Sequence, residues 1–195
     1  AALRWAGKEM ERRYNILELT RVRDIDSYHE NILTPALEKL RKAGGAALGE
    51  DVPEAMPYIV IILDELADIM HTFPRELEGA VVRLAQMSRA VGIHLVLSTQ
   101  RPSVNVITGL IKANVPARVA LQVASQFDSR TILDQGGAEN LLGSGDMLYM
   151  SAEMGKPIRL QNAFISEKEV KTVVDFIAKN NEAELPIEIG PPAND

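Results

Sequence analysis

Residues 58–65, with the sequence YIVIILDE, constrain the fold of this 195-residue chain more than any other segment. An unbroken run of β-branched and aliphatic residues is typical of a strand buried on both faces of a parallel sheet. Asp64 and Glu65 come directly after this run. Ligands of parallel sheets bind beyond the carboxyl ends of the strands. We therefore expect both carboxylates at a ligand site; the alternative is that they only supply the acidic first turn of a following helix.

The rest of the chain alternates between helical and strand-like segments. Strand-like segments follow at residues 93–100, 117–123, 146–150 and 157–165. The last two are expected to be antiparallel if they form a hairpin through Met154-Gly155. Helical patterns occupy residues 3–17, 26–35, 36–42, 66–70, 74–91, 104–113, 125–133 and 139–142. Ser166 with Glu169 is expected to form a capping box that opens a closing helix. Such alternation predicts right-handed crossovers and an α/β fold with a largely parallel sheet.

Composition narrows the class of protein. With 46% hydrophobic and 25% charged residues, the chain has the balance of a globular domain, and no apolar run approaches the ~20 residues of a membrane span. The chain has no cysteine and its three histidines lack metal-ligand spacing, so disulfides and zinc are not expected. A net charge of −6 argues against coating nucleic acid by bulk electrostatics, but it allows local contacts from a few basic loops.

Four sequence blocks carry a family resemblance: MERRY (residues 10–14), DELAD (64–68), STQRPSVNVITGLIKANVPARVALQV (98–123) and DSRTILDQGGAENLLGSGDMLYM (128–150). Through them the chain resembles the motor domain of FtsK/SpoIIIE-type double-stranded DNA translocases. The resemblance implies a RecA-like P-loop NTPase core with a mainly parallel sheet flanked by helices, over residues 1–181. Residues 182–195 are expected to be a linker or tail toward a C-terminal winged-helix domain, and residues 44–57 a surface loop.

The resemblance also implies a function. It is ATP-driven movement of double-stranded DNA through a homo-hexameric ring, for chromosome partition during cell division or sporulation, with ATP and Mg²⁺ as cofactors. The motor portion is expected to be cytoplasmic, without membrane contact of its own, in a parent protein that carries any membrane anchor elsewhere.

One expected motif is missing. No G-x-x-x-x-G-K-[ST] loop occurs, since Gly7-Lys8 and Gly155-Lys156 lack both the upstream glycine and the following hydroxyl residue. In the family this phosphate loop lies upstream of the opening helix. We therefore expect an N-terminally incomplete motor core that is inactive alone, because backbone donors and a lysine of that loop hold the phosphates.

The resemblance assigns roles to four residues at the nucleotide site. Asp64 is expected to coordinate Mg²⁺, Glu65 to polarise the attacking water and Gln100 to sense the γ-phosphate. Arg89, in the segment SRAVG, is expected to reach into the next subunit's site as an arginine finger. The alternatives are a polar strand end for Gln100 and, for Arg89, a cation that complements a helix C-terminus.

Arg101, Lys112 and Arg130 match basic positions that face the pore in the family and touch DNA phosphates. Arg130 has an alternative role, pairing with Asp128 or Asp134 inside the fold.

Two other functions remain open: a conjugative coupling-type DNA pump, and a nucleotide-deficient module that only assembles or binds DNA. The blocks at residues 101–106 and 134–137 favour the translocase.

Overall fold

The computed structural model describes residues 1–42 and 52–181. The chain divides into two compact units, the first being Ala1–Gln100 and the second starting at Arg101. Most of the predicted loop at residues 44–57 and the whole predicted tail at 182–195 lie outside the described residues. The assignment of residues 1–181 to one motor domain stays a prediction.

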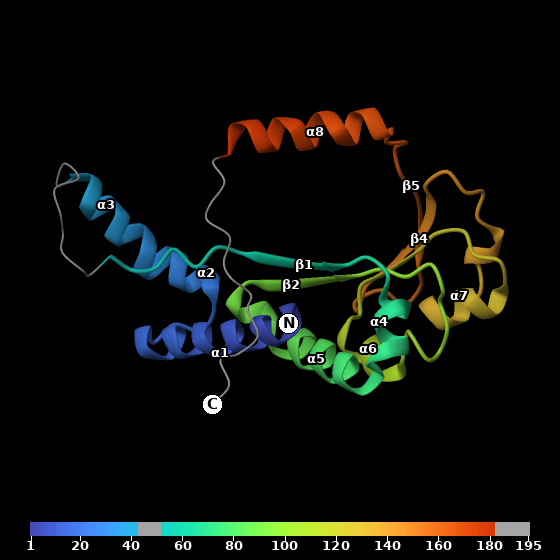
Figure 1. Ribbon diagram of the computed structural model, residues 1–195, viewed down its shortest axis with the longest axis horizontal. Coiled ribbons are helices and arrows are strands. Elements are labelled where there is room, and N and C mark those ends of the chain that lie inside the picture. The colour runs from blue at the N-terminus through green and yellow to red at the C-terminus, as the bar shows by residue number, and fades with distance from the viewer. Residues whose placement is uncertain (43–51, 182–195) are drawn as a thin grey trace. The chain divides into compact units, whose positions relative to one another are not determined.

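The first unit is built around two parallel strands (Figure 1). β1 (Ile59–Leu63) pairs with β2 (Ile93–Leu97) in a register that sets Ile59 beside Ile93 and Leu63 beside Leu97. Between the strands lie α4 (Leu66–Thr72), α5 (Pro74–Met87) and the 3-10 turn η2 (Ser88–Val91), and before them come α1 (Ala2–Thr20), α2 (Ile25–Tyr28), the π-helical turn η1 (His29–Leu33) and α3 (Thr34–Lys42). The two helical stretches predicted at residues 26–35 and 36–42 thus form one continuous helical run of three pieces, and the predicted break at Thr34-Pro35 does not occur.

Local sequence signals set several of these boundaries. Pro74 occupies the first turn of α5, where a missing N–H costs nothing. Asp24 caps α2 by accepting a hydrogen bond from the Ser27 amide at 2.9 Å. Gly92 adopts φ 74° after η2, a conformation that side chains with a Cβ rarely take, and β2 begins directly after it.

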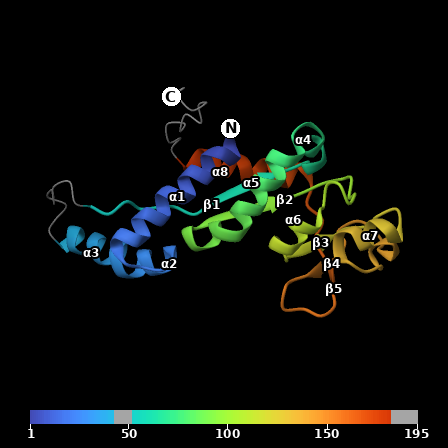
Figure 2. The ribbon, with the colours of Figure 1, turned by 90° about the horizontal axis from the view of Figure 1, so that it is seen from below.

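One face of this strand pair carries the core of the unit. α1 and α5 cover that face (Figures 1 and 2), and α1 residues such as Met10 and Leu17 pack with Ile59, Ile61 and Leu95 of the strands.

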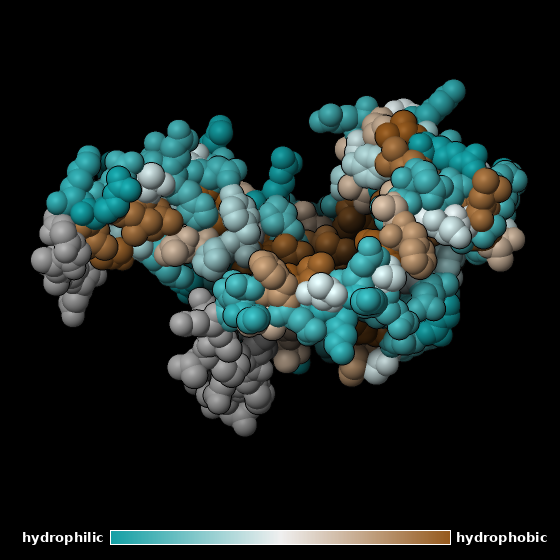
Figure 3. All heavy atoms as spheres, turned by 90° about the horizontal axis from the view of Figure 1, so that it is seen from above, coloured by the Kyte–Doolittle hydropathy of each residue, from teal (hydrophilic) through white to brown (hydrophobic). Residues whose placement is uncertain are grey.

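On the opposite face of this strand pair, side chains of β1 are exposed within the described residues. Val60 and Ile62 are 58% and 67% exposed. In Figure 3 apolar surface, drawn brown, is visible in the middle of the view. The prediction that β1 is buried on both faces is therefore wrong for the described part of the chain, because successive side chains of a strand point to opposite faces and the helices of this unit pack on one of them.

The second unit holds an antiparallel sheet in the order β3–β4–β5. Its elements are α6 (Gly109–Asn114), β3 (Arg118–Ala120), α7 (Gln126–Leu133), η3 (Ala138–Asn140), β4 (Asp146–Met150), β5 (Ile158–Gln161) and α8 (Glu167–Asn180). The predicted β4–β5 hairpin and the capping box of Ser166 and Glu169 are confirmed. The helix predicted at residues 104–113 forms only as α6, because the Thr108 side chain caps the helix there by accepting from the Ile111 amide at 3.3 Å.

The prediction of one largely parallel sheet is wrong in part. The fold is mixed α/β, but β3 pairs antiparallel with β4 instead of joining β1 and β2. The chain reverses at Gly143, Ser144 and Gly145, which all have positive φ. β4 therefore returns along β3, although α7 and η3 lie between them. Alternation along the sequence gives the order of elements, not the direction in which each strand runs.

Candidate functional site

The carboxyl ends of β1 and β2 bring three of the predicted site residues together. The strands continue their pairing past their last residues, since the Ser98 amide donates to the Leu63 carbonyl and the Leu66 amide to the Ser98 carbonyl, both at 2.8 Å. Asp64 and Glu65 therefore lie beside the segment that ends in Gln100. This is the edge at which parallel sheets bind ligands.

At least three hydrogen bonds hold the Glu65 carboxylate. One carboxylate oxygen, Oε1, accepts from the Thr99 hydroxyl at 2.5 Å and from the Ala67 amide at 3.0 Å. The other, Oε2, accepts from the Gln100 amide at 2.9 Å. The bond to Ala67 caps α4, and the other two join the β1 end to the β2 end. Glu65 is thus both a helix cap and a link between the strand ends, and its carboxylate contacts the backbone of the predicted phosphate sensor directly.

Asp64 has a different environment. Its side chain is exposed, and it makes no hydrogen bond or ion pair with any other residue in the described ranges. No group of three or more metal-ligating side chains occurs among the residues that the structure describes. Mg²⁺ commonly takes only one or two protein carboxylates and completes its shell with water and phosphate oxygens. A single carboxylate at a strand end, without a hydrogen bond or ion pair among the described residues, therefore fits Mg²⁺ that is bound together with a nucleotide.

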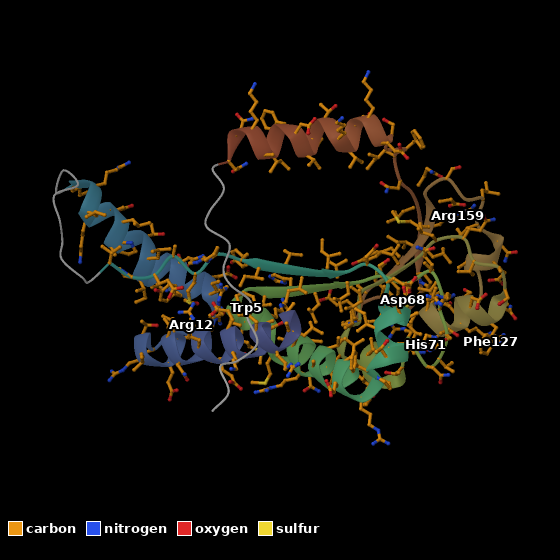
Figure 4. All side chains as sticks on the ribbon, in the orientation of Figure 1. Trp5, Arg12, Asp68, His71, Phe127 and Arg159 are labelled. Carbon is orange, nitrogen blue, oxygen red and sulfur yellow. The ribbon has the colours of Figure 1, made fainter. Side chains whose placement is uncertain are left out.

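Asp68 lies one turn further along, on α4 (Figure 4). It is exposed on the helix. This placement agrees with a solvated carboxylate of α4 rather than with a third catalytic acid at the strand end.

Arg89 lies at the other end of the strands, in η2, directly before Gly92 and β2. It lines a cavity of about 610 Å³ together with Tyr58, His94 and Asp26. The five residues of β1 span roughly 16 Å, more than an arginine side chain covers. Arg89 therefore does not reach the carboxylates of its own strand edge. Its side chain is exposed and has no hydrogen bond or ion pair within the described part of the chain.

The three predicted DNA contacts all belong to the second unit. Lys112 donates to Asp134 Oδ1 at 2.6 Å, and Arg118 donates to Asp134 Oδ2 at 2.6 Å. Hydrogen bonds from Lys112 and then Arg118 lower the pKa of Asp134. Lys112, with its side chain 21% exposed, is thus already paired with a carboxylate.

Arg130 is exposed and pairs with neither of its two alternative partners among the described residues. Asp128 instead accepts from the Ser125 hydroxyl at 2.7 Å. Arg101 is also exposed and immediately follows Gln100.

Comparison with known proteins places the chain in a family. The model of the FtsK/SpoIIIE family matches residues 1–104, which include MERRY, the β1 strand with its carboxylates, and Gln100. The chain belongs to the FtsK/SpoIIIE family.

Curated relatives in the FtsK/SpoIIIE family are much longer than this chain. The DNA translocase FtsK of Clostridium tetani is 52% identical over 187 residues, which cover 96% of this chain and 23% of the relative. The DNA translocase SpoIIIE of Bacillus subtilis is 48% identical over 190 residues, covering 97% of this chain and 23% of SpoIIIE. The chain thus spans about a quarter of the length of these relatives.

Solved structures agree on the fold of this FtsK/SpoIIIE segment. The pCW3 conjugation coupling protein TcpA, in its monomer form with ATPγS, superposes with a TM-score of 0.69 at 23% identity, over 90% of this chain and 48% of TcpA. The cytoplasmic domain of the type VII secretion ATPase EccC from Thermomonospora curvata gives a TM-score of 0.66 at 23% identity, over 95% of this chain and 20% of EccC.

In the described part of the chain, no helix combines the length and the apolar character needed to cross a membrane.

Sequence reasoning missed Thr99 in this FtsK/SpoIIIE segment. Thr99 lies between Ser98 and Gln100, in the block that carries the family resemblance. Nothing in the sequence indicates that this threonine contacts a glutamate 34 positions earlier. The strand register is what aligns them.

Proposed function

We propose that this chain is the carboxylate-bearing part of an ATP-driven motor that moves double-stranded DNA, used in chromosome partition during cell division or sporulation. Membership of the FtsK/SpoIIIE family supports the proposal. The single observation that carries it is the cluster of Asp64, Glu65 and the Gln100 amide at the ligand-binding edge of parallel strands. The same proposal includes ATP, Mg²⁺ and a homo-oligomeric ring around DNA.

Each residue at this edge has a distinct task. Asp64 would hold Mg²⁺, which when bound neutralises charge that develops on the phosphates. Glu65 accepts a hydrogen bond from the attacking water and orients it, because its own hydrogen bonds fix the direction of the carboxylate. Gln100 presents its side chain at the same edge while its amide holds Glu65, so that a shift of Gln100 toward a phosphate also moves the acid.

Arg89 acts in the neighbouring subunit. Its position at the amino end of the strands leaves it unable to serve its own carboxylates, whereas the amino end of one subunit can face the carboxyl end of the next in a head-to-tail ring. Such a finger stabilises charge in the transition state and contributes ~10³–10⁵ in rate.

A conjugative coupling pump is the second candidate, because TcpA shares the fold. At 23% identity that similarity extends to the fold alone, whereas relatives near 50% identity are DNA translocases. The translocase is therefore the better-supported function.

The test uses the full-length protein and measures ATP hydrolysis with and without long duplex DNA. Asp64→Asn is expected to lower DNA-stimulated turnover by about 10²–10³-fold, the cost of losing a preorganised charge-stabilising group. The matched control is Asp68→Asn, which changes an exposed carboxylate on α4 and should retain turnover. DNA-stimulated hydrolysis at the wild-type rate in Asp64→Asn would refute the proposal, and absence of any DNA stimulation in the wild type would favour the passive module.

A further inference from the structure

The MERRY segment at residues 10–14 has no task in the function proposed above. It lies in α1, and its Arg13 is only 2% exposed, which is rare for an arginine. Two hydrogen bonds offset the cost of burying its charged guanidinium group. Arg13 Nε donates to Glu9 Oε1 at 2.8 Å, and Nη1 donates to the Val91 carbonyl at 2.9 Å. Glu9 stays ionised at neutral pH, because hydrogen bonds from Arg12 and then Arg13 lower its pKa.

The next residue of α1 makes a second contact of the same kind. The Tyr14 hydroxyl donates to the Met87 carbonyl at 2.7 Å. Met87 is the last residue before η2, and Val91 is the last residue of η2. Two consecutive side chains of one helix thus bond the backbone at both ends of the four-residue turn that carries Arg89.

The turn is also fixed from within. Ser88 is 3% exposed, and its hydroxyl donates to the Ile93 carbonyl at 2.7 Å, which joins the start of the turn to the start of β2. The Arg89 side chain, in contrast, has no hydrogen bond or ion pair among the described residues. No polar contact of its own therefore fixes this side chain, and the backbone of the turn sets where it begins.

These contacts matter for a residue that acts outside its own subunit. A group that completes another chain's site must be presented with sub-ångström accuracy, and a displacement of 1 Å can cost about 10²-fold in rate. We propose that Arg13 and Tyr14 are positioning residues, which hold the η2 turn so that Arg89 reaches the nucleotide site of the neighbouring subunit. This inference rests on the proposed function of Arg89.

The test compares two tyrosine-to-phenylalanine variants in the full-length protein. Tyr14→Phe keeps the ring and removes only the hydroxyl that bonds Met87. Tyr28→Phe is the matched control, because its hydroxyl donates to the Glu54 carbonyl at 2.9 Å in the same unit and makes no hydrogen bond to η2 among the described residues. Tyr14→Phe is expected to lower the kcat of DNA-stimulated ATP hydrolysis by ~10–100-fold with an unchanged KM for ATP, whereas Tyr28→Phe keeps the wild-type kcat.

Mixed assemblies separate positioning from a general loss of structure. Asp64→Asn subunits have a defective site of their own but an intact Arg89. Mixing them with Tyr14→Phe subunits is expected to restore activity above the sum of the two parents, as mixing them with Arg89→Ala subunits should. A fold defect in Tyr14→Phe would not be rescued in this way.

The outcomes are distinguishable. If Arg89→Ala is rescued by Asp64→Asn but Tyr14→Phe is not, or if Tyr14→Phe and Tyr28→Phe have the same kcat, the positioning role is overturned while the role of Arg89 stands. If Arg89→Ala is not rescued, the action of Arg89 in the neighbouring subunit is refuted, and the positioning role with it.

Discussion

The hydrogen bond from Thr99 to Glu65 ties the two strand ends together, and its strength can be measured. Thr99→Val replaces the hydroxyl with a methyl group of similar shape and removes one hydrogen bond that Glu65 Oε1 accepts, while the bond from the Ala67 amide stays. A hydrogen bond to a charged group contributes about 1.5–3 kcal/mol when it is shielded from water. Both side chains here are partly exposed, so we take the lower end and expect a loss of about 1–1.5 kcal/mol in the free energy of unfolding.

Glu65→Gln, the usual way to inactivate such an acid, is not structurally neutral in this arrangement. Donors face both carboxylate oxygens. An amide NH₂ would therefore point at the N–H of either Gln100 or Ala67 and leave it without an acceptor, at a cost of about 1–3 kcal/mol. Because Thr99 and Glu65 share one hydrogen-bond network, the two substitutions together should cost less than the sum of their separate effects, with a coupling energy of at least ~0.5 kcal/mol.

The assay is urea unfolding of the chain followed by tryptophan fluorescence. Trp5 is the single tryptophan of the sequence, and it packs against the core of the first unit, so the signal reports on the unit that contains Glu65. Thr72→Val is the matched control. The Thr72 hydroxyl donates to the Asp68 carbonyl at 3.3 Å on an exposed helix end, and its loss should change stability by less than ~0.5 kcal/mol. Strict additivity of Thr99→Val and Glu65→Gln, or a Thr99→Val midpoint equal to that of the wild type, would refute the reasoning.

Three further predictions follow from other contacts. Gly92→Ala should lower the free energy of unfolding by about 1–3 kcal/mol in the same assay, because φ is 74° and a Cβ would lie 2.5 Å from Ile25 Cδ1; an unchanged midpoint contradicts this. Hydrogen bonds from Arg159 and then the Leu142 amide lower the pKa of Asp146 from 3.8 to about 2. Stability from this group is thus complete above the unfolded-state pKa and is lost as the pH falls toward 2. Thermal unfolding followed by circular dichroism should show this loss of stability, and the Asp146→Asn variant should show a smaller loss. Parallel pH profiles of the variant and the wild type would contradict a contribution from Asp146. In the full-length protein, Arg130→Gln should reduce the slope of log Kobs for duplex DNA against log salt by ~0.9. Lys112→Gln should change the slope less, because Lys112 already pairs with Asp134. Equal changes in the two slopes would contradict the placement of these cations.

The strand of residues 58–63 and the carboxylates after it could be predicted from the sequence, as could the capping box of Ser166 and Glu169 and the β4–β5 hairpin. These features depend on residues close together in the chain: a β-branched run, a cap three residues from its partner, a short turn. The adjacency of Glu65 and Gln100 followed as well, because two neighbouring parallel strands must end at the same edge.

The tertiary structure alone decided the direction of β3, the exposed face of β1 and the Thr99 contact to Glu65. It also decided the pairing of Lys112 with Asp134 and the hydrogen bonds from α1 to the turn that carries Arg89. Each of these joins residues that are distant in the sequence, or depends on what covers a surface. Local propensity determines whether a segment is a helix or a strand, but a hydrogen bond between segments requires the register and direction that the whole chain reaches only when its core is packed.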